Sequence, residues 1–354
     1  MRETLINLIR PEVRGQEAYV ADLSPCRIKL DANENPFLLR PALRKKWLAA
    51  LREVPLNRYP EPGAPALLPR FAEAWGVDSA GLMIGNGSDE LIQILCTSLQ
   101  GTNVLVPTPT FVMYRISALN NGHRVTEVPL DGDFDLDLGA TLEKIRSLSP
   151  ALIFLSYPNN PTGNCFSREK IIALLESAPG FVVVDEAYGN FSGQSFLPLL
   201  GKYDNLVILK TLSKVGLAAL RIGFLIGAPS LVRELNKVRL PYNLNALSQV
   251  GAGFYLEHEA AFLKQAREIV RMREKLFRAL QAIPGIHPYR SEANFVFFSC
   301  LFDTDNVYEK LRRQGIIIKN FNRTALLKNC MRVTVGSEGE NDAFLEALQR
   351  IIAE

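Results

Sequence analysis

The chain has 354 residues, of which 47% are hydrophobic and 22% are charged, and its formal net charge at pH 7 is +3. This length is long for one domain and sufficient for two, and the composition is that of a globular protein with a sizeable core. So small a net charge gives no argument for nucleic-acid binding, and no run approaches the roughly 18 apolar residues of a membrane span.

Short apolar runs alternate with helical patterns through the middle of the chain. The runs are nearly continuous in hydrophobicity, which is typical of strands buried on both faces of a mostly parallel sheet. Between them, residues 88–100 and 168–178 have the pattern of helices. The predicted strands, in chain order, are 103–106, 151–156, 181–184, 206–209 and 222–226.

The first candidate ligand site is a glycine-containing turn that follows the apolar run 82–84. It contains Gly87, Ser88 and Asp89 and precedes an apolar helix. Glycines there allow backbone N–H groups to point inward, and the start of the helix offers donors to an anion. A plain glycine turn closed by a helix cap would have the same pattern, so this motif alone does not distinguish an anion-binding site from a structural turn.

Two predicted strands are followed by residues that could contact a flat aromatic ring. Phe111 follows the 103–106 strand and could stack on such a ring. Asn160 follows the 151–156 strand, in an Asn-Pro-Thr-Gly turn that proline and glycine make tight. Its amide could donate to a phenolic oxygen on the ring and so change the pKa values of that ring.

Asp185 closes the next predicted strand and is followed three residues later by Tyr188. Open α/β sheets bind ligands at the carboxyl ends of their strands. Asp185 could pair there with a protonated pyridine nitrogen, which keeps the ring an electron acceptor, and Tyr188 could bond a phenolic oxygen. A simple cap at the strand end is the competing interpretation of Asp185.

The most informative stretch follows the 206–209 strand. Thr211, Ser213 and Arg221 can hold a phosphate dianion, and Lys214 can form a Schiff base with an aldehyde. Pyridoxal 5′-phosphate is one small molecule that needs both kinds of partner. Most Ser-Lys pairs are solvated surface, so the hypothesis depends on the whole series of strand ends.

A long helical pattern spans about 257–281, and a Pro-Gly pair after it ends the helix. Strand candidates at 294–299, 315–319 and 331–335 then surround a predicted helix at 304–314, which indicates a smaller α+β domain. The first 50 or so residues are expected to join this domain because they cannot form a core alone. The predicted division is 1–50 as an N-terminal arm and part of the small domain, 51–256 as the large cofactor-binding domain, and 257–354 as the interdomain helix and small C-terminal domain.

The five cysteines are scattered, odd in number and never spaced as Cys-x-x-Cys, which predicts reduced thiols in a cytoplasmic protein. None of the three histidines stands at metal-ligand spacing from another histidine or a cysteine, so no metal site is expected. The N-terminal residues carry charges among apolar ones, unlike a signal peptide.

With these motifs, the chain resembles the pyridoxal-phosphate-dependent aminotransferases of the aspartate aminotransferase-like fold over essentially its whole length. It is most similar to the histidinol-phosphate aminotransferase family, on segments 30–37, 57–60, 85–90, 109–114 and 331–336. The resemblance implies an α/β fold. A large domain would hold a mostly parallel seven-stranded sheet flanked by helices, and a smaller α+β domain would be built from both chain ends.

The resemblance also implies roles for individual residues. Lys214 is the Schiff-base lysine and proton shuttle, and Asp185 pairs with the pyridine nitrogen. Tyr188, together with Asn160, holds the phenolic oxygen of the cofactor. Tyr59 is expected to reach the cofactor phosphate of a neighbouring subunit, so a homodimer is implied. The expected cofactor contacts are Tyr59, Gly87, Ser88, Asp89, Phe111, Asn160, Asp185, Tyr188, Thr211, Ser213, Lys214 and Arg221.

Arg332 resembles the family arginine that grips the anionic end of the substrate, and Tyr19 and Asn33 are expected on the substrate side. Lys319 stands where the family often has an arginine near the substrate phosphate. Lysine keeps the charge but loses the two-pronged geometry of a guanidinium.

The implied reaction is a ping-pong transamination in histidine biosynthesis. It converts L-histidinol phosphate and 2-oxoglutarate into imidazole-acetol phosphate and L-glutamate, all of them small molecules. A threonine-phosphate-type decarboxylase and an aromatic-amino-acid aminotransferase on the same scaffold remain alternatives. A transcription regulator with a pyridoxal-phosphate sensor is disfavoured, because no DNA-binding module is expected before Asp31.

Overall fold

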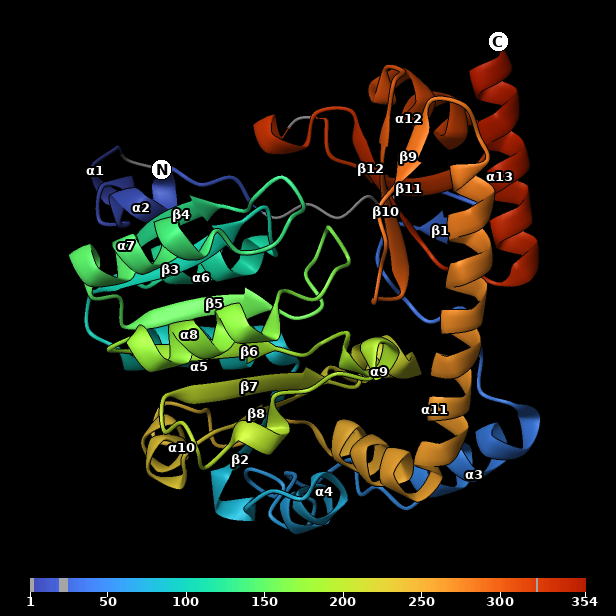
Figure 1. Cartoon of the computed structure of the whole chain (residues 1–354). Helices are drawn as coiled ribbons and strands as arrows, with labels where there is room; N and C mark the ends of the chain where they lie inside the picture. Colours follow the sequence, from blue (N-terminus) through green and yellow to red (C-terminus); the bar gives the residue numbers. More distant parts are fainter. Residues whose placement is uncertain (1–2, 19–24, 323) are drawn as a thin grey trace.

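Two β-sheets and one long helix that runs past both organise the chain (Figure 1). The computed structural model describes residues 3–18, 25–322 and 324–354. The larger sheet has seven strands and the smaller has five. The predicted α/β fold with a mostly parallel seven-stranded sheet is therefore confirmed.

The larger sheet has the strand order β2-β8-β7-β6-β5-β3-β4. β8 is antiparallel to both of its neighbours, and the other neighbouring strands are parallel. The carboxyl ends of six strands and the start of β8 therefore lie at the same edge. The strands are β2 (Leu82–Asn86), β3 (Asn103–Thr108), β4 (Arg124–Pro129), β5 (Leu152–Ser156), β6 (Phe181–Asp185), β7 (Leu206–Thr211) and β8 (Ile222–Ile226).

Both faces of this sheet are buried, which explains why its central strands are apolar at every position. Along β5, Leu152 and Phe154 belong to a core formed with α5, α6 and α10, whereas Ile153 and Leu155 belong to a core formed with α4, α7, α8 and α11. Figure 1 shows α7 and α8 in front of the strands. Successive strand residues point to opposite faces, so a continuous apolar run requires cover on both.

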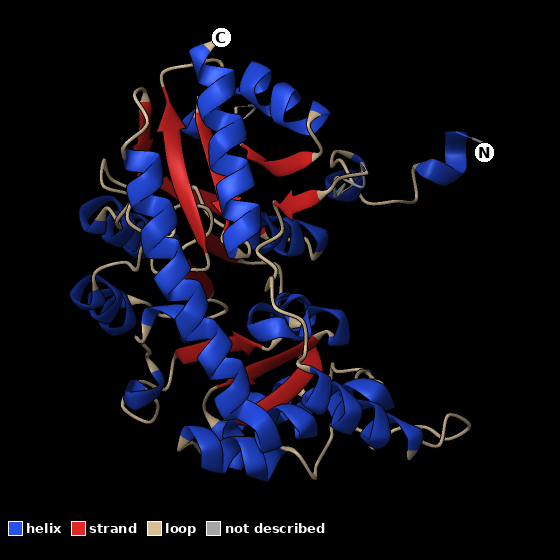
Figure 2. Ribbon diagram, turned by 90° about the vertical axis from the view of Figure 1, so that its right-hand side faces the viewer, coloured by secondary structure: helices blue, strands red, loops and turns tan. Residues whose placement is uncertain are grey.

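The smaller sheet has the order β1-β11-β12-β10-β9, and only the β1–β11 pair is parallel. Its apolar face packs against α11, α12 and α13. Figure 2 shows these helices beside the sheet and the N-terminal helix projecting from the body. The strands are β1 (Ile28–Leu30), β9 (Ile286–Pro288), β10 (Phe295–Cys300), β11 (Ile316–Asn320) and β12 (Cys330–Thr334).

The helices connect these strands in chain order. The α-helices are α1 (Glu3–Ile6), α2 (Pro11–Arg14), α3 (Pro41–Arg52), α4 (Leu68–Trp75), α5 (Ser88–Ser98), α6 (Val112–Asn120), α7 (Leu138–Leu148), α8 (Arg168–Ser177), α9 (Gly189–Ser192), α10 (Pro229–Leu235), α11 (Ala246–Gln281), α12 (Thr304–Arg313) and α13 (Glu338–Ala353). Short turns of other helix types are η1 (Ser79–Gly81), η2 (Leu197–Leu199), η3 (Ser213–Leu217), η4 (Ala218–Leu220) and η5 (Ala325–Leu327).

The long helix α11 begins at Ala246 and is kinked at His258, whose φ of −129° is non-helical. The predicted helix at about 257–281 matches the part after this kink, whereas the sequence did not predict the first part of α11. Asn245 caps it by accepting a hydrogen bond from the backbone N–H of Ser248 at 2.9 Å. Its first turns contain glycine where packing is tight, because a Cβ on Gly251 would lie 2.3 Å from Leu220. Glycine weakens the helical signal in the sequence. No helix within the described ranges is both long and apolar enough to cross a membrane.

The N-terminal residues contact several parts of the structure. β1 joins the smaller sheet, whereas Trp47 of α3 packs against Phe254 of α11, with ring centroids 5.4 Å apart. Arg10 donates to the backbone oxygen of Asn120 at the end of α6. The division into 1–50, 51–256 and 257–354 stays a prediction.

Candidate active site

A cavity of about 90 Å³ lies at the edge of the larger sheet where the carboxyl ends of its parallel strands meet. It collects residues from β5, β6, β7, the start of α5 and the start of β8. The lining residues are Ser88, Asp89, Phe111, Tyr114, Ser156, Asn160, Asp185, Ala187, Tyr188, Thr211, Ser213, Lys214 and Arg221. Nearly all of the residues expected to bind the cofactor are therefore together in one place.

One wall of the cavity is built by the glycine turn between β2 and α5. Gly87 has a φ of 81°, and a Cβ there would lie 2.5 Å from the guanidinium of Arg221. A Cβ on Gly223 would lie 2.4 Å from the backbone N of Ser88. Without side chains, these glycines allow β8 to approach the start of α5, where free N–H groups and the helix dipole favour an anion.

Arg221 is held at this anion-binding wall before any ligand arrives. Its backbone is in the left-handed region, with a φ of 51°, and its Nη2 donates to Asp89 Oδ2 at 2.7 Å. Left-handed backbone is unfavourable for residues other than glycine, so the surrounding structure enforces it. The guanidinium is consequently ordered beside the start of α5.

The hydroxyls of Thr211 and Ser213 lie together at the end of β7. Thr211 Oγ1 is 3.0 Å from Ser213 Oγ and donates to the backbone oxygen of Ile222 at 2.9 Å. Lys214 follows within the π-helical turn η3. Its Nζ is 3.4 Å from the backbone oxygen of Ala32 and 5.6 Å from the ring centroid of Tyr188. One amine and a set of phosphate-type donors thus share the cavity.

Asp185 is buried at the end of β6 and has only neutral hydrogen-bond donors. Tyr114 Oη donates to its Oδ2 at 2.8 Å and the Ala187 N–H donates to its Oδ1 at 3.0 Å. Burial raises the pKa of Asp185 to about 6, although both hydrogen bonds act in the opposite direction. Burial also keeps the pKa of Tyr114 well above its usual range, so this phenol stays a donor.

This combination fits pyridoxal phosphate. A buried carboxylate without a cationic partner would be stabilised by a protonated pyridine nitrogen, and a phosphate would find the hydroxyls, the guanidinium and the start of α5. The single lysine among the lining residues would face the aldehyde. Few other small molecules use all three features.

The raised pKa of Asp185 predicts how the cofactor-free protein responds to pH. The folded state holds a proton that the unfolded state has lost between about pH 4 and about pH 6, so the contribution of Asp185 to stability falls as pH rises through this window. Above it, the charged carboxylate costs about 3 kcal/mol. Asp185→Asn should therefore make the cofactor-free protein more stable than the wild type at pH 7, and the difference should shrink towards pH 4. Urea unfolding at both pH values checks this; equal stability at pH 7 would contradict it.

Arg332 lies on β12 and reaches the cavity through Asn160. Its Nη1 donates to Asn160 Oδ1, and its Nη2 donates to the backbone oxygen of Asp31 at 2.6 Å. The guanidinium also lies 5.0 Å from the ring centroid of Phe295. Asn160, expected to bind the cofactor, and Arg332, expected to bind the substrate anion, are therefore in direct contact.

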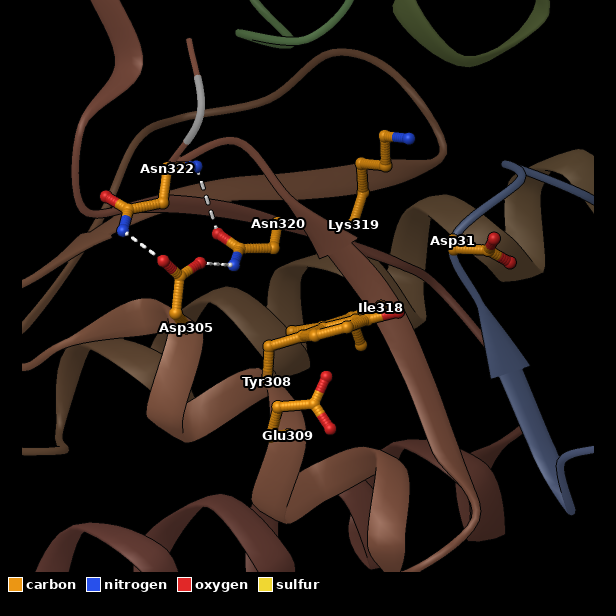
Figure 3. Close-up of a pocket in the computed structure, with 8 residues that line it drawn as sticks. All are labelled: Asp31, Asp305, Tyr308, Glu309, Ile318, Lys319, Asn320 and Asn322. Carbon is orange, nitrogen blue, oxygen red and sulfur yellow. Dashed lines mark hydrogen bonds between the residues drawn. The ribbon is translucent and has the colours of Figure 1, made fainter. Parts of the chain in front are cut away.

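Lys319 does not line this cavity but lines a second one of about 560 Å³ (Figure 3). On the neighbouring strand, Arg332 is its paired residue. In Figure 3, Lys319 and Asp31 lie at one end of the group, and Asp305, bonded to Asn320 and Asn322, lies at the other. The lining residues are Asp31, Asp305, Tyr308, Glu309, Ile318, Lys319, Asn320 and Asn322.

The remaining predicted residues lie elsewhere. Tyr59 is 81% exposed and stacks on Tyr242, with ring centroids 4.5 Å apart. Asn33 is buried, and its amide contacts the Tyr188 hydroxyl. Tyr19 is outside the described residues. Among the residues that are described, no group of three or more His, Cys, Asp or Glu side chains could hold a metal ion.

Tyr114 and Ser156 also line the cavity, although neither is among the site residues predicted from the sequence. Tyr114 is one helical turn after Phe111, so the two rings face the same side, 5.5 Å apart. Ser156 is the last residue of β5 and pairs in register with Asp185 on β6. Both could have been found, Tyr114 by its helical spacing and Ser156 by its place at a strand end.

Comparisons with known proteins agree with this geometry. The family described as aminotransferase class I and II matches residues 27–348. A histidinol-phosphate aminotransferase 2 from Nitrosococcus oceani is 47% identical to the chain, and the alignment covers 98% of each protein. A histidinol-phosphate aminotransferase from Chromobacterium violaceum is 44% identical over 99% of each.

Solved structures share the fold. A histidinol-phosphate aminotransferase from Sinorhizobium meliloti, in complex with pyridoxal 5′-phosphate, has a TM-score of 0.87 at 23% identity, covering 98% of this chain and 97% of that chain. An L-threonine-O-3-phosphate decarboxylase from Porphyromonas gingivalis has a TM-score of 0.81 at 22% identity, covering 92% and 100%. A scaffold this widely shared leaves the reaction to be argued from the site.

Proposed function

Because this chain belongs to the aminotransferase class I and II family, we propose that it is a pyridoxal-phosphate-dependent transaminase acting on L-histidinol phosphate and 2-oxoglutarate. Imidazole-acetol phosphate and L-glutamate are the products. The observation that carries the proposal is the cavity in which Lys214, Asp185 and the phosphate-type donors meet. The relatives named for this reaction, which align with almost the whole chain, support the choice of substrate.

When bound, pyridoxal phosphate supplies an aldehyde that condenses with amines and a ring that accepts electrons from the substrate carbon. Lys214 anchors the aldehyde and then, as a free amine, moves the proton at the reacting carbon. Asp185 holds the positive charge on the pyridine nitrogen inside a buried, low-dielectric site. Asn160 and Tyr188 donate to the phenolic oxygen.

The phosphate is proposed to sit against the start of α5. There Arg221, Thr211 and Ser213 supply charged and neutral donors, and the backbone N–H groups of Ser88 and Asp89 add to them. Phe111, at the start of α6, would offer its ring for stacking on the cofactor. The hydrogen bond between Arg221 and Asp89 keeps the Arg221 guanidinium ordered before the cofactor binds, which lowers the entropic cost of phosphate binding.

A single-turnover absorbance experiment tests the proposed function. The purified yellow protein is mixed with L-histidinol phosphate in the absence of any oxo-acid. Loss of the absorbance of the aldehyde form, growth of that of the amine form, and reversal by 2-oxoglutarate are expected. Release of carbon dioxide without an oxo-acid would instead indicate a decarboxylase, and an equal response to aromatic amino acids would indicate an aromatic aminotransferase.

Arg332 is proposed to bind the anionic group of both substrates, with Lys319 nearby for the phosphate. Arg332→Ala should raise KM about 100-fold for both L-histidinol phosphate and L-glutamate, because each loses a charge-assisted pair of hydrogen bonds. Steady-state kinetics for each half-reaction measures this. Lys319→Ala is the matched control and should raise KM for L-histidinol phosphate alone. An Arg332 effect confined to one substrate would contradict a shared anion site.

The protein is also proposed to act as a homodimer in which Tyr59 reaches the partner's cofactor phosphate. Tyr59 is exposed, and so are large apolar side chains close in sequence to Tyr59 or to its stacking partner Tyr242, namely Leu56, Leu240 and Leu247. Such an apolar patch is typical of an interface. A cytoplasmic location is proposed too, because all five cysteines are unpaired.

Mixed dimers test the role of Tyr59. When Tyr59→Ala and Lys214→Ala chains are mixed and refolded together in equal amounts, about a quarter of the sites should combine an intact Lys214 with an intact Tyr59 of the other chain. Activity should therefore return on mixing and exceed that of either variant alone. No recovery would show that Tyr59 acts within its own chain or not at all.

A further inference from the structure

We propose that Asn33 is a positioning residue that fixes the direction of the Tyr188 hydroxyl, so that the proton of this hydroxyl points into the cofactor cavity. The inference rests on the proposed function, because it assigns Asn33 to the same site. It differs from the expectation that Asn33 touches the substrate. Asn33 is 2% exposed and is not among the lining residues of either cavity.

The hydrogen bond between the two side chains determines the direction. Asn33 Nδ2 donates to Tyr188 Oη at 2.9 Å. An amide nitrogen carries only donors, so the tyrosine oxygen is the acceptor in this bond. Its own proton must then point to another acceptor. Tyr188 lines the cavity, where the proposed phenolic oxygen of the cofactor would be that acceptor.

Three further hydrogen bonds fix Asn33, two at its backbone and one at its amide oxygen. The Asn33 N–H donates to Thr334 Oγ1 at 3.0 Å, and Thr334 Oγ1 in turn donates to Asn33 Oδ1 at 3.2 Å. Asn294 Nδ2 donates to the Asn33 backbone oxygen at 2.9 Å. Since Oδ1 is the acceptor for Thr334, Nδ2 is the atom that faces Tyr188.

The backbone of Asn33 is also held in an uncommon conformation. Its φ is 56°, in the left-handed region, and Thr334 and Asn294 are as deeply buried as Asn33 itself. Asparagine tolerates this region better than most residues, but it persists only where neighbours enforce it. Strand β12 and the residues before β10 thus hold Asn33 against Tyr188, which follows β6 of the other sheet.

The direction of the Tyr188 proton has a measurable consequence. A hydrogen bond donated to a negatively charged phenolic oxygen stabilises that charge, and so lowers the pH at which the absorbance of the bound cofactor changes. Among the described residues, charged or titratable groups near Tyr188 include Lys214, whose Nζ lies over its ring, and Arg332, which lies over the adjoining Phe295 ring. Tyr114 from α6 and the Asp185 carboxylate that it bonds line the same cavity, but the titration compares variants in which Asp185 is unchanged. These groups stay in place in the variants below.

Asn33→Gly is the most direct test, because glycine adopts the left-handed backbone without strain. The holoenzyme is titrated by absorbance from acid to alkaline pH, for Asn33→Gly, Tyr188→Phe and the double variant. Asn33→Gly should move the midpoint upward by about one pH unit, since the hydroxyl loses its fixed direction. In the Tyr188→Phe background the same substitution should move it much less. In the kinetics, kcat should fall while KM for L-histidinol phosphate changes little.

Thr334 provides a matched pair of controls. Thr334→Val removes the donor that orients the amide and should also raise the midpoint, whereas Thr334→Ser keeps the hydroxyl and should restore it. Equal shifts for Asn33→Gly with and without the Tyr188 hydroxyl would overturn the proposal, as would no shift at all. A wild-type protein that binds no pyridoxal phosphate would instead refute the proposed function, and the positioning role with it.

Discussion

Replacement of Lys214 by alanine is expected to lower the rate of transamination by about 10⁴-fold, while binding of the cofactor remains measurable. Lys214 is the one amine among the described residues that line the cavity, so no neighbour can take over its proton transfer. The proposed phosphate-binding side chains Arg221, Thr211 and Ser213 are unchanged in this variant. Affinity should therefore fall much less than turnover.

Single-turnover absorbance and a cofactor-binding titration measure the two effects separately. Lys210→Arg is a suitable control, because Lys210 lies four residues earlier on β7 and pairs with buried Glu186, at 2.8 Å, rather than with the cavity. It should keep nearly full activity. A Lys214→Ala protein with wild-type turnover would contradict the assignment of Lys214 as the Schiff-base and proton-transfer lysine.

The second large effect is expected at Asp185. Asp185→Asn should lower kcat by about 10³-fold, because a neutral amide cannot stabilise positive charge on the ring in a buried site. The amide can still accept the hydrogen bond from Tyr114, so the local structure should be kept. The same substitution is expected to stabilise the cofactor-free protein. A lower kcat together with a higher free energy of unfolding would show that the charge of Asp185 serves catalysis and destabilises the fold.

The pre-steady-state rate of the first half-reaction, measured with saturating cofactor, checks this expectation. Tyr114→Phe serves as the comparison. It removes one neutral donor from Asp185 but keeps the charge, so a loss of about tenfold is expected. Comparable losses in the two variants would mean that the charge of Asp185 is not what the reaction needs.

The cavity could be predicted because its residues follow consecutive strands. Asp185 is the last residue of β6, and Asn160 and Lys214 come shortly after β5 and β7, so the parallel strands place all three at one edge. Arg221 is different, since it precedes β8. It reaches the same edge because β8 is antiparallel, and no pattern in the sequence reports strand direction.

Contacts between distant segments could not be predicted in this way. Asn33 and Tyr188 are 155 residues apart, and Asn160 and Arg332 are 172 apart. Each pair meets because the two sheets pack together, and local periodicity carries no information about that packing.

Some observed strands are absent from the predicted set, and for β4 and β9 the reason is simple. β4 lies at the edge of its sheet and exposes polar side chains, so it lacks the continuous apolar run of the central strands. β9 is an edge strand of only three residues. The part of α11 before the kink at His258 was not predicted, because its glycines serve packing rather than helix propensity.

The parallel pairing of β1 with β11 has a consequence for biosynthesis. Ile28 leaves the ribosome long before its partner Ile316. The larger sheet can form while β1 is still unpaired, because the last strand of that sheet in the chain, β8, ends at Ile226. Asn33, directly after β1, and Arg332 on β12 are therefore the last parts of the site to be fixed. A nascent chain can thus assemble the phosphate-binding residues well before it can hold a substrate, because substrate binding must wait until β11 and β12 have been synthesised.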